Sequence, residues 1–221
     1  MVVSSTSDRV DRAALELFAE KGFAATGIRE LAERAGVSGA ALYHYMGTKE
    51  DLLVRVMNRG TFRLLHVAER ALEDAASPAE RLGRLVALHV YCHAHAPLEA
   101  LVLDNELRAL SDVNRRAVVA SRDDYERLWR DALVDGRREG TFRLEELGVA
   151  RLALLEMCNG VARWYSPGGP LDDMTLCETF VDVAFGAVDA HGEHGRLSHR
   201  DIRLPDVREL YEEATAEAAS R

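Results

Sequence analysis

Residues 26–53 decide the fold, and they read TGIRELAERAGVSGAALYHYMGTKEDLL. Apolar side chains recur at helical spacing through 28–35. Gly36 follows them, and glycine adopts the left-handed backbone of a sharp turn without strain. Ser38 then offers a side-chain cap for a second short helix over 39–45. Two short helices joined by a tight turn predict a helix-turn-helix, in which the second helix enters the major groove of DNA.

The second helix of this motif has an inward and an outward face. Leu42 points into the domain together with the residues four positions before and after it, Ser38 and Met46. The residues left facing outward are Gly39, Ala40, Tyr43 and His44. Small residues at the helix start, with an aromatic side chain one turn later, allow a close approach to the groove.

The motif extends into a longer pattern, F-A-E-K-G-F-x-x-T-x-I-R-E-L-A-x-x-A-G-V-S-x-x-x-L-Y-H-Y-M-x-x-K-E-x-L-L, between Ala14 and about Val56. This pattern resembles the DNA-binding domain of TetR-family transcriptional regulators. Met46 stands where that family usually has Phe, and Met fills a gap in a core comparably well. The resemblance implies DNA contacts at Thr26, Arg29, Ser38, Gly39, Ala40, Tyr43, His44 and Lys49.

Three of these positions have a competing structural role. Thr26 is also placed to cap the helix over 28–35. Arg29 is expected either at a phosphate or guanine edge, or in a surface salt bridge with Glu33. Lys49 lies in the first turn of the following helix, where a cation opposes the helix dipole. We therefore expect it to bind a phosphate oxygen together with the free amides of that helix, the alternative being a solvated lysine.

Charge is divided unevenly along the chain. The 221 residues carry 28 Lys and Arg against 37 Asp and Glu, a formal net charge of −9. Residues 1–60 hold eight charges of each sign, so the whole excess lies in residues 61–221. This balance excludes a protein that holds nucleic acid by bulk charge, and fits one that uses a few placed cations and two half-sites.

Targeting and redox signals point to the cytoplasm. The N-terminus, MVVSSTSDR, has no apolar run of signal length, and no stretch approaches the roughly 18 consecutive apolar residues of a membrane span. Cys92, Cys158 and Cys177 lie in apolar helical surroundings, and their odd number predicts reduced thiols. We therefore expect a cytoplasmic protein without membrane partners.

Helical patterns fill the remaining chain, so the expected class is all-α. A three-helix DNA-binding domain is predicted over 1–52, and a helical ligand-binding and dimerisation domain over 53–221. Ser7 is expected to cap the first helix, and Ser77-Pro78-Ala79-Glu80 is a typical helix start. The predicted helices outside the motif cover 8–22, 49–75, 78–96, 98–110, 112–140, 145–165 and 173–188. A loop is predicted over 191–195, and an amphipathic helix over 205–219.

The helices predicted over 145–165 and 173–188 are candidates for a subunit interface. The second has apolar residues on more than one face, too many for a lone surface helix. In TetR-like proteins these two helices of each subunit form a four-helix interface. The resemblance therefore implies a homodimer, whose two-fold symmetry matches a palindromic double-stranded DNA operator.

Bulky side chains between residues 60 and 165 are candidates for an effector site. Taken singly, each is more commonly plain core than pocket lining. The family resemblance favours a pocket, because the second domain of these regulators usually binds a small molecule. The expected lining residues are Phe62, Tyr91, His95, Leu103, Leu107, Tyr125, Trp129, Met157, Arg163 and Trp164.

The segment 163–171, RWYSPGGPL, narrows the expected effector. It is similar to R-W-Y-x-P-G-G-x-L in a TetR branch that controls fatty-acid and sterol breakdown and senses acyl-CoA thioesters. This likeness implies that Arg163 meets CoA phosphates and that the aromatic residues line an acyl channel. Alternatively, the segment only shapes the turn between the two interface helices. An acyl-CoA-responsive repressor is the expected function, and a drug- or aromatic-responsive repressor of efflux genes is the alternative.

A different class of function rests on His89, Cys92, His93 and His95. Their spacing places imidazole and thiol groups on one helix, as a metal or thiol sensor or an enzyme requires. However, no second cluster with metal-ligand spacing is present, and no third residue is evident to orient a Cys–His pair. We therefore expect neither an enzyme nor a resident metal or cofactor.

Overall fold

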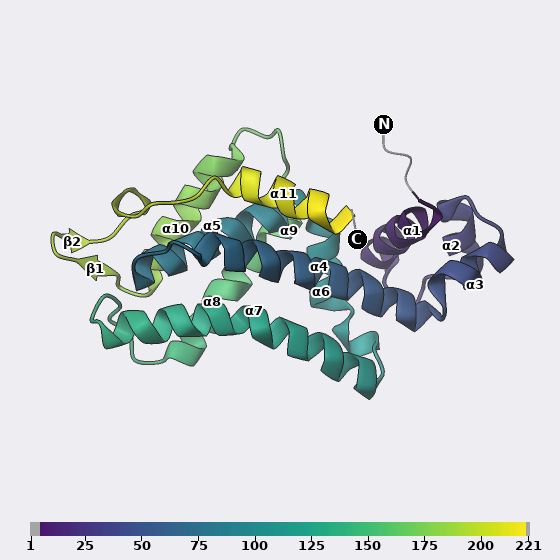
Figure 1. Ribbon diagram of the computed structural model, residues 1–221, viewed down its shortest axis with the longest axis horizontal. Helices are drawn as coiled ribbons and strands as arrows, with labels where there is room; N and C mark the ends of the chain where they lie inside the picture. The colour runs from purple at the N-terminus through teal and green to yellow at the C-terminus, as the bar shows by residue number, and fades with distance from the viewer. Residues whose placement is uncertain (1–4, 220–221) are drawn as a thin grey trace. The chain divides into compact units, whose positions relative to one another are not determined.

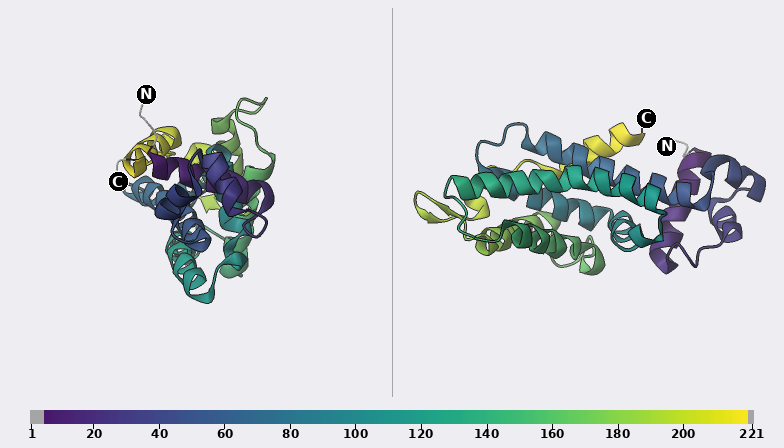
Figure 2. Two further views of the ribbon diagram at one scale, coloured as in Figure 1. Left: turned by 90° about the vertical axis from the view of Figure 1, so that its right-hand side faces the viewer. Right: turned by 90° about the horizontal axis from the view of Figure 1, so that it is seen from below.

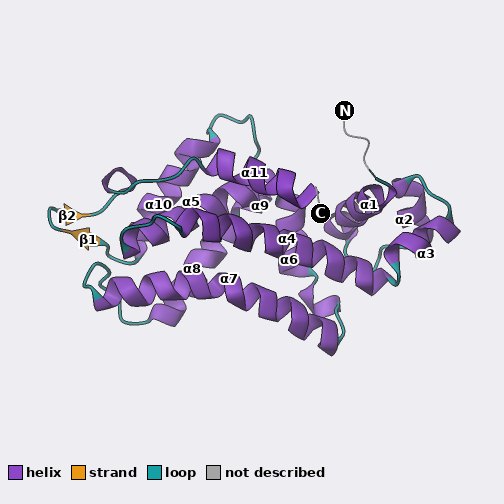
Figure 3. Ribbon diagram, in the orientation of Figure 1, coloured by secondary structure: helices purple, strands orange, loops and turns teal. Residues whose placement is uncertain are grey.

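The computed structural model describes residues 5–219, and these residues are almost entirely helical (Figure 1). The helices are α1 (Thr6–Lys21), α2 (Ile28–Ala35), α3 (Gly39–Met46), α4 (Lys49–Leu72), α5 (Pro78–His95), α6 (Pro97–Asn105), α7 (Asp112–Arg138), α8 (Leu147–Asn159), α9 (Val161–Trp164), α10 (Asp173–Ala187) and α11 (Val207–Ala219). A small hairpin of β1 (His191–Gly192) and β2 (Gly195–Arg196) is the sheet of the described chain (Figure 3). The predicted all-α class is confirmed.

The chain forms two compact units, each with its own apolar core. The first consists of the residues up to Phe62 together with Leu98–Arg122, and the second of Arg63–Pro97 and the residues from Asp123 onward. Helices α4 and α7 each run from one unit into the other along the sequence. A boundary after residue 52 remains a prediction. Within residues 5–219, no helix is both long and apolar enough to cross a membrane.

The core of the first unit forms where the apolar faces of α1, α2 and α3 meet. Leu17, Leu31 and Leu42 are fully buried there. Helix α1 begins earlier than predicted, because Ser5 and not Ser7 caps it. The Ser5 hydroxyl accepts from the Asp8 amide at 3.1 Å, and the Asp8 carboxylate accepts from the Ser5 amide at 3.1 Å. This reciprocal pair satisfies two amides of the first turn.

Helix α5 is the central helix of the second unit. Nearly all of its residues are buried, and α8, α9, α10 and α11 pack around it. Its start matches the sequence prediction, with the Ser77 hydroxyl accepting from the Glu80 amide at 3.1 Å and Pro78 in the first turn. Four helices enclose α5, so its polar side chains Glu80, Arg84, His89 and His93 are buried together with its apolar ones.

Two predicted helices are interrupted in the structure. The segment 145–165 divides at Gly160 into α8 and α9. Glycine is a poor helix former, so the backbone hydrogen bonds of the helix are interrupted there. The segment 98–110 ends as an α-helix at Asn105 and continues as a 3-10 turn over Leu107–Ala109. Both breaks shorten elements that were predicted as continuous.

The C-terminal segment folds back on the second unit. The loop predicted over 191–195 is wrong, because it forms the β1–β2 hairpin. Helix α11 follows, buries Val207 and Ala214, and lies beside the later part of α4 (Figure 2). There Arg70 pairs with Glu213 at 2.6 Å.

Candidate nucleic-acid interface and effector core

Helix α3 presents the outward face that its sequence predicts. Leu42 and Met46 are buried at 0% and 1% exposure, so the Met at the usual Phe position fills the core. Tyr43 is 58% exposed. The other exposed side chains or backbone positions on this face are Ser38, Gly39, Ala40 and His44. The six predicted contact positions in 29–44 are therefore accessible to a DNA groove, with Arg29 on α2 also exposed.

The turn before α3 is built from backbone geometry and one cap. Gly36 has φ 65° and ψ 40°, the left-handed conformation that a side chain would strain. The Ser38 hydroxyl accepts from the Ala41 amide at 3.2 Å. The hydroxyl thus satisfies an amide at the N-terminus of the reading helix, and α3 starts abruptly.

Thr26 does not cap α2, whereas its DNA contact remains a prediction. Its side chain is 2% exposed, and its hydroxyl donates to the carbonyl oxygens of Gly22 at 2.8 Å and Leu17 at 3.3 Å. Gly27 is the cap residue of α2, which has no side-chain cap. The Thr26 side chain therefore closes the end of α1.

Lys49 contacts the α1–α2 turn. Its ammonium donates to the carbonyl oxygens of Phe23 at 2.7 Å and Thr26 at 2.9 Å. It also lies 4.3 Å from the centre of the Phe23 ring. Lys49 is half-buried and two backbone carbonyls hold its ammonium, while its phosphate contact remains a prediction. The two carbonyl oxygens of the α1–α2 turn stabilise a cation at the start of α4, where the helix dipole alone would disfavour one.

Arg29 is the accessible cation of the predicted set. Within residues 5–219 it forms no ion pair, so the alternative salt bridge to Glu33 is not made. Nearby cations are already engaged: Lys21 with Glu30, and Arg34 with Glu20 at 3.1 Å. Arg29 can therefore reach a DNA phosphate without breaking an existing pair.

The second unit contains a buried polar cluster on α5, α7 and α8, which we call the core cluster: His89, His93, Tyr125, Trp129 and Asn159. The ring nitrogens of His89 contact the Tyr125 hydroxyl and the Asn159 side-chain oxygen, both at 2.8 Å. His93 stacks on His89 with 3.9 Å between ring centres. Burial raises the pKa of Tyr125 well above its ordinary value. Tyr125 therefore stays protonated and takes part in this polar cluster as a neutral phenol inside an apolar core.

Two comparisons decide the family. Residues 12–56 match the profile of bacterial regulatory proteins of the tetR family, and residues 75–188, more than half of the chain, match the tetracyclin repressor-like C-terminal domain. The chain belongs to the TetR family. As TetR-family proteins are, it is a DNA-binding transcriptional regulator and not an enzyme, and its relatives support repression.

Several TetR proteins align over most of the chain. The transcriptional repressor KstR2 of Mycolicibacterium smegmatis is 27% identical over 84% of this chain and 91% of its own. The regulator PfmR of Thermus thermophilus has a structure with a TM-score of 0.72 and 32% identity, covering 84% of this chain and all of its own. AibR, solved with isovaleryl coenzyme A and operator DNA, has a TM-score of 0.74 at 23% identity, covering 81% of this chain and 97% of its own, and shares the fold.

The predicted effector residues of this TetR protein do not form one group. Tyr125 and Trp129 belong to the core cluster. Phe62, Leu103 and Leu107 belong to the first unit, where the two leucines pack on its core. Sequence order placed all five on helices that should face one another, but the breaks around α6 carry Leu103 and Leu107 into the first unit.

Tyr91 and His95 are covered by the C-terminal segment. Their rings stack with 4.2 Å between centres, and Tyr211 of α11 lies edge-on to Tyr91 at 5.6 Å. His95 contacts the Asp173 carboxylate at 2.9 Å, and Arg208 of α11 pairs with the same carboxylate at 3.5 Å. Tyr91 and His95 therefore pack against α11, and their role in effector binding remains a prediction.

Met157, Arg163 and Trp164 lie near the α9–α10 turn. Met157 is half-buried against the core of the second unit, whereas Arg163 is exposed. Trp164 is 56% exposed, and its ring stacks on Phe180 of α10 with 6.3 Å between centres. The RWYSPGGPL segment thus presents a cation and an indole at the surface.

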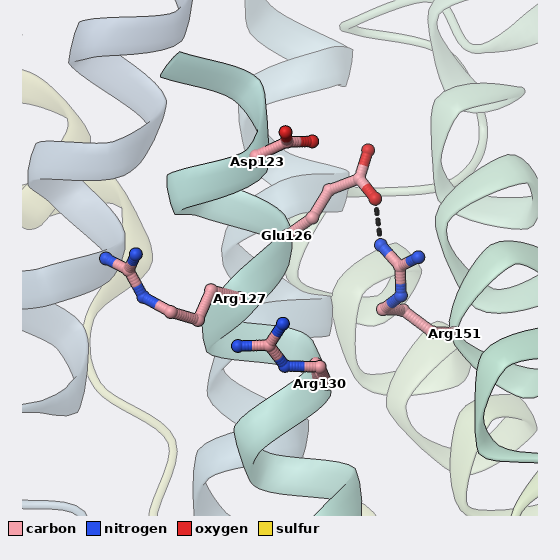
Figure 4. Close-up of a pocket in the computed structure, with 5 residues that line it drawn as sticks. All are labelled: Asp123, Glu126, Arg127, Arg130 and Arg151. Carbon is pink, nitrogen blue, oxygen red and sulfur yellow. Dashed lines mark hydrogen bonds and ion pairs between the residues drawn. The ribbon is translucent and has the colours of Figure 1, made fainter. Parts of the chain in front are cut away.

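A hollow of about 320 Å³ lies on α7 and α8, lined by Asp123, Glu126, Arg127, Arg130 and Arg151 (Figure 4). The Arg151 guanidinium pairs with the Glu126 carboxylate across the two helices. Arg127 pairs with Asp124 at 2.8 Å. No sequence pattern marks this hollow, because its charged residues resemble those of any solvated helix face.

The metal alternative finds no support in the arrangement of His89 and His93. Both ring nitrogens of His89 are engaged by Tyr125 and Asn159, and His93 Nδ1 lies 2.9 Å from the His89 carbonyl oxygen. Among residues 5–219, no three His, Cys, Asp or Glu side chains gather as metal ligands do.

Three residues of these clusters are not among the predicted site residues: Asn159, Arg208 and Tyr211. Asn159 could have been predicted from the sequence. It lies four residues after Leu155, on the apolar face of α8, and a polar amide on such a face indicates a buried hydrogen bond. Nothing in the sequence connected α11 with Tyr91, because the contact bridges more than a hundred residues.

Proposed function

We propose that this TetR protein is a homodimeric, cytoplasmic repressor of lipid-breakdown genes, released from a palindromic operator by an acyl-CoA thioester. The exposed pair Arg163 and Trp164 carries the effector part of this proposal. A guanidinium suits the phosphates of CoA, and an accessible indole face suits its adenine ring. The relatives KstR2 and AibR support it, since AibR was solved with isovaleryl coenzyme A.

The DNA part of the proposal rests on α3. Gly39 and Ala40 leave room for the groove floor, and Tyr43 and His44 extend from the same exposed face. We place Tyr43 and His44 at phosphates, with Arg29 at a phosphate or a guanine edge. Ser38 stays at the start of this reading surface as its cap.

The dimer part rests on apolar side chains that α8 and α10 leave uncovered. Val149 is 65%, Leu152 53% and Val183 50% exposed. Large aliphatic groups on two adjacent helices favour burial against the same helices of a second copy. Light scattering of the wild type and of the double variant Leu152→Glu/Val183→Glu tests the dimer. Only the wild type should have the mass of two chains.

The first experiment measures fluorescence anisotropy of labelled DNA from upstream of the protein's own gene. Tight, salt-sensitive binding is expected for wild type and for Tyr45→Ala, the control on the same helix. Tyr43→Ala should bind at least tenfold more weakly, because it loses a contact to a charged group worth about 1.5–3 kcal/mol. Equal binding by wild type and Tyr43→Ala would contradict the reading surface.

The complex is then titrated with acyl-CoA esters and with the matching free acids. Release by an ester at concentrations where the acid has no effect supports the acyl-CoA effector. Release only by CoA-free aromatic compounds would favour the efflux alternative, for which the aromatic core cluster is the supporting observation. Metal analysis of the purified protein, with His89→Ala as the matched variant, tests the sensor alternative.

A further inference from the structure

The core cluster contains a buried donor without an acceptor. Trp129 is 0% exposed, and its Nε1 has no hydrogen-bond partner within the described chain. It lies near enough to the Tyr125 hydroxyl to favour ionisation of that group, but not in hydrogen-bond geometry. Leaving such a donor unsatisfied costs about 1–3 kcal/mol, and cores rarely contain one. A ligand atom that accepts from Trp129 would remove this cost.

The groups around Trp129 form a hydrogen-bonded frame, which consists of the five side chains of the core cluster. The Asn159 side chain is oriented with its oxygen 2.8 Å from His89 Nε2, and an amide oxygen only accepts. His89 Nε2 therefore donates to this oxygen, and His89 Nδ1 lies 2.8 Å from the Tyr125 hydroxyl. The edge of Trp129 meets His89 at right angles, with 5.6 Å between ring centres. Hydrogen bonds among neighbours thus hold the indole while its own N–H stays unused.

The side chains of the core cluster also limit the charge that a ligand group bound at Trp129 can carry. None of these five side chains is a Lys, Arg, Asp or Glu, and the buried Arg84 is occupied by Asp74, Glu80 and two carbonyl oxygens. A carboxylate brought to Trp129 would be a buried charge that needs a protonated His89 or His93 as its counter-ion, which is costly inside an apolar core. A neutral acceptor, such as a carbonyl oxygen on an apolar chain, satisfies the N–H without this penalty.

We propose that Trp129 Nε1 is the donor that recognises a carbonyl oxygen on the uncharged acyl part of the effector. The inference rests on the proposed function and deepens it, since it explains why a thioester and not a free acid is the effector. The oxygen is either the thioester carbonyl or a ketone further along the acyl group. Glu126, one turn before Trp129 on α7, lines the surface hollow of Figure 4.

The indole N–H itself gives the test, because the chain has only two tryptophans. Two indole resonances are expected in a proton–nitrogen NMR spectrum, assigned with Trp129→Phe and Trp164→Phe. The probes are an acyl-CoA ester, its keto-acyl counterpart, the free acid, and the CoA-free N-acetylcysteamine thioester. A downfield shift of the Trp129 resonance with thioester probes, but not with the acid, supports the inference.

The probes also distinguish the Trp129 donor from the acyl-CoA effector, and the thioester carbonyl from a ketone on the acyl group. A Trp129 shift with the CoA-free thioester alone would support this donor while overturning CoA recognition at the Arg163 pair. Acyl-CoA binding that moves the Trp164 resonance and leaves Trp129 unmoved would overturn the donor and keep the acyl-CoA effector. No Trp129 shift with any thioester overturns the inference. A shift only with keto-acyl probes assigns the oxygen to the ketone.

A second measurement remains valid even if Trp129→Phe is less stable. The affinity of an acyl-CoA thioester is compared with that of the thioether analogue, which has a methylene in place of the carbonyl. Wild type should prefer the thioester by about tenfold, the equivalent of one hydrogen bond. Trp129→Phe should bind both equally, since it keeps a ring but no N–H. An unchanged preference in the variant would overturn the inference.

Discussion

The ammonium of Lys49 donates to the carbonyl oxygen of Phe23 at 2.7 Å and also lies 4.3 Å from the centre of that residue's ring. The first turn of α4 is thereby fastened to the α1–α2 turn, with a second bond to the Thr26 carbonyl at 2.9 Å. Each bond joins a charged donor to a backbone carbonyl of that turn. Lys49 thus contributes to the shape of the reading head before any DNA binds.

Lys49→Met is expected to lower the free energy of unfolding by about 1–3 kcal/mol, because two carbonyl oxygens lose a charged donor. Urea unfolding followed by circular dichroism measures this. Lys21→Met is the control, since its pair with Glu30 is at the surface and contributes less than about 1 kcal/mol. The opposite result would be unchanged stability together with a weaker salt dependence of operator binding, by the amount expected for about one lost phosphate contact. That result would show that Lys49 binds a DNA phosphate.

Gly136→Ala is expected to destabilise the second unit by about 1–3 kcal/mol. A Cβ there would stand 2.1 Å from a ring atom of Phe142, whose side chain is 2% exposed and has no room to move. Gly186→Ala on α10 is the matched control, because nothing lies within 4 Å of its Cβ position. The control should be neutral or stabilising by up to about 1 kcal/mol. Thermal unfolding of both variants gives the comparison.

Cys158 and Cys177 should be nearly unreactive in the folded protein, because burial raises the pKa of both thiols well above the ordinary 9.0. Modification by a thiol reagent at pH 8, with and without urea, measures this. The unfolded thiols ionise near their ordinary pKa while the folded ones stay protonated. Their contribution to stability is therefore complete below pH 9 and declines above it. Rapid labelling of either residue without denaturant would contradict the burial.

The anchoring of α11 should depend more on apolar burial than on charge. Val207→Ala, at a 0% exposed position, should cost about 2 kcal/mol. The double variant Glu213→Gln/Glu217→Gln removes two partly exposed ion pairs to Arg70. It should lower the free energy of unfolding by no more than about 1 kcal/mol, and by less in high salt. Urea unfolding at two salt concentrations separates the two contributions. A larger, salt-sensitive effect of the double variant would reverse this order.

Local patterns predicted the helices well wherever the controlling contacts lie within a few residues. The turn at Gly36, the cap at Ser38 and the start of α5 at Ser77 all depend on near neighbours. The two helix breaks were missed because Gly160 and the segment after Asn105 stand in otherwise periodic sequence. Periodicity reports which side is apolar, but not where the backbone ladder is interrupted.

The sequence by itself determined the family, the all-α class and the exposed face of α3, since motif spacing and helical periodicity are properties of neighbouring residues. Only the tertiary structure decided the partners of Lys49 and Thr26, the covering of Tyr91 and His95 by α11, and the unsatisfied Nε1 of Trp129. Each of these depends on which groups distant segments bring within about 3–6 Å, the range over which hydrogen bonds and ring contacts act. A one-dimensional pattern contains no such distances.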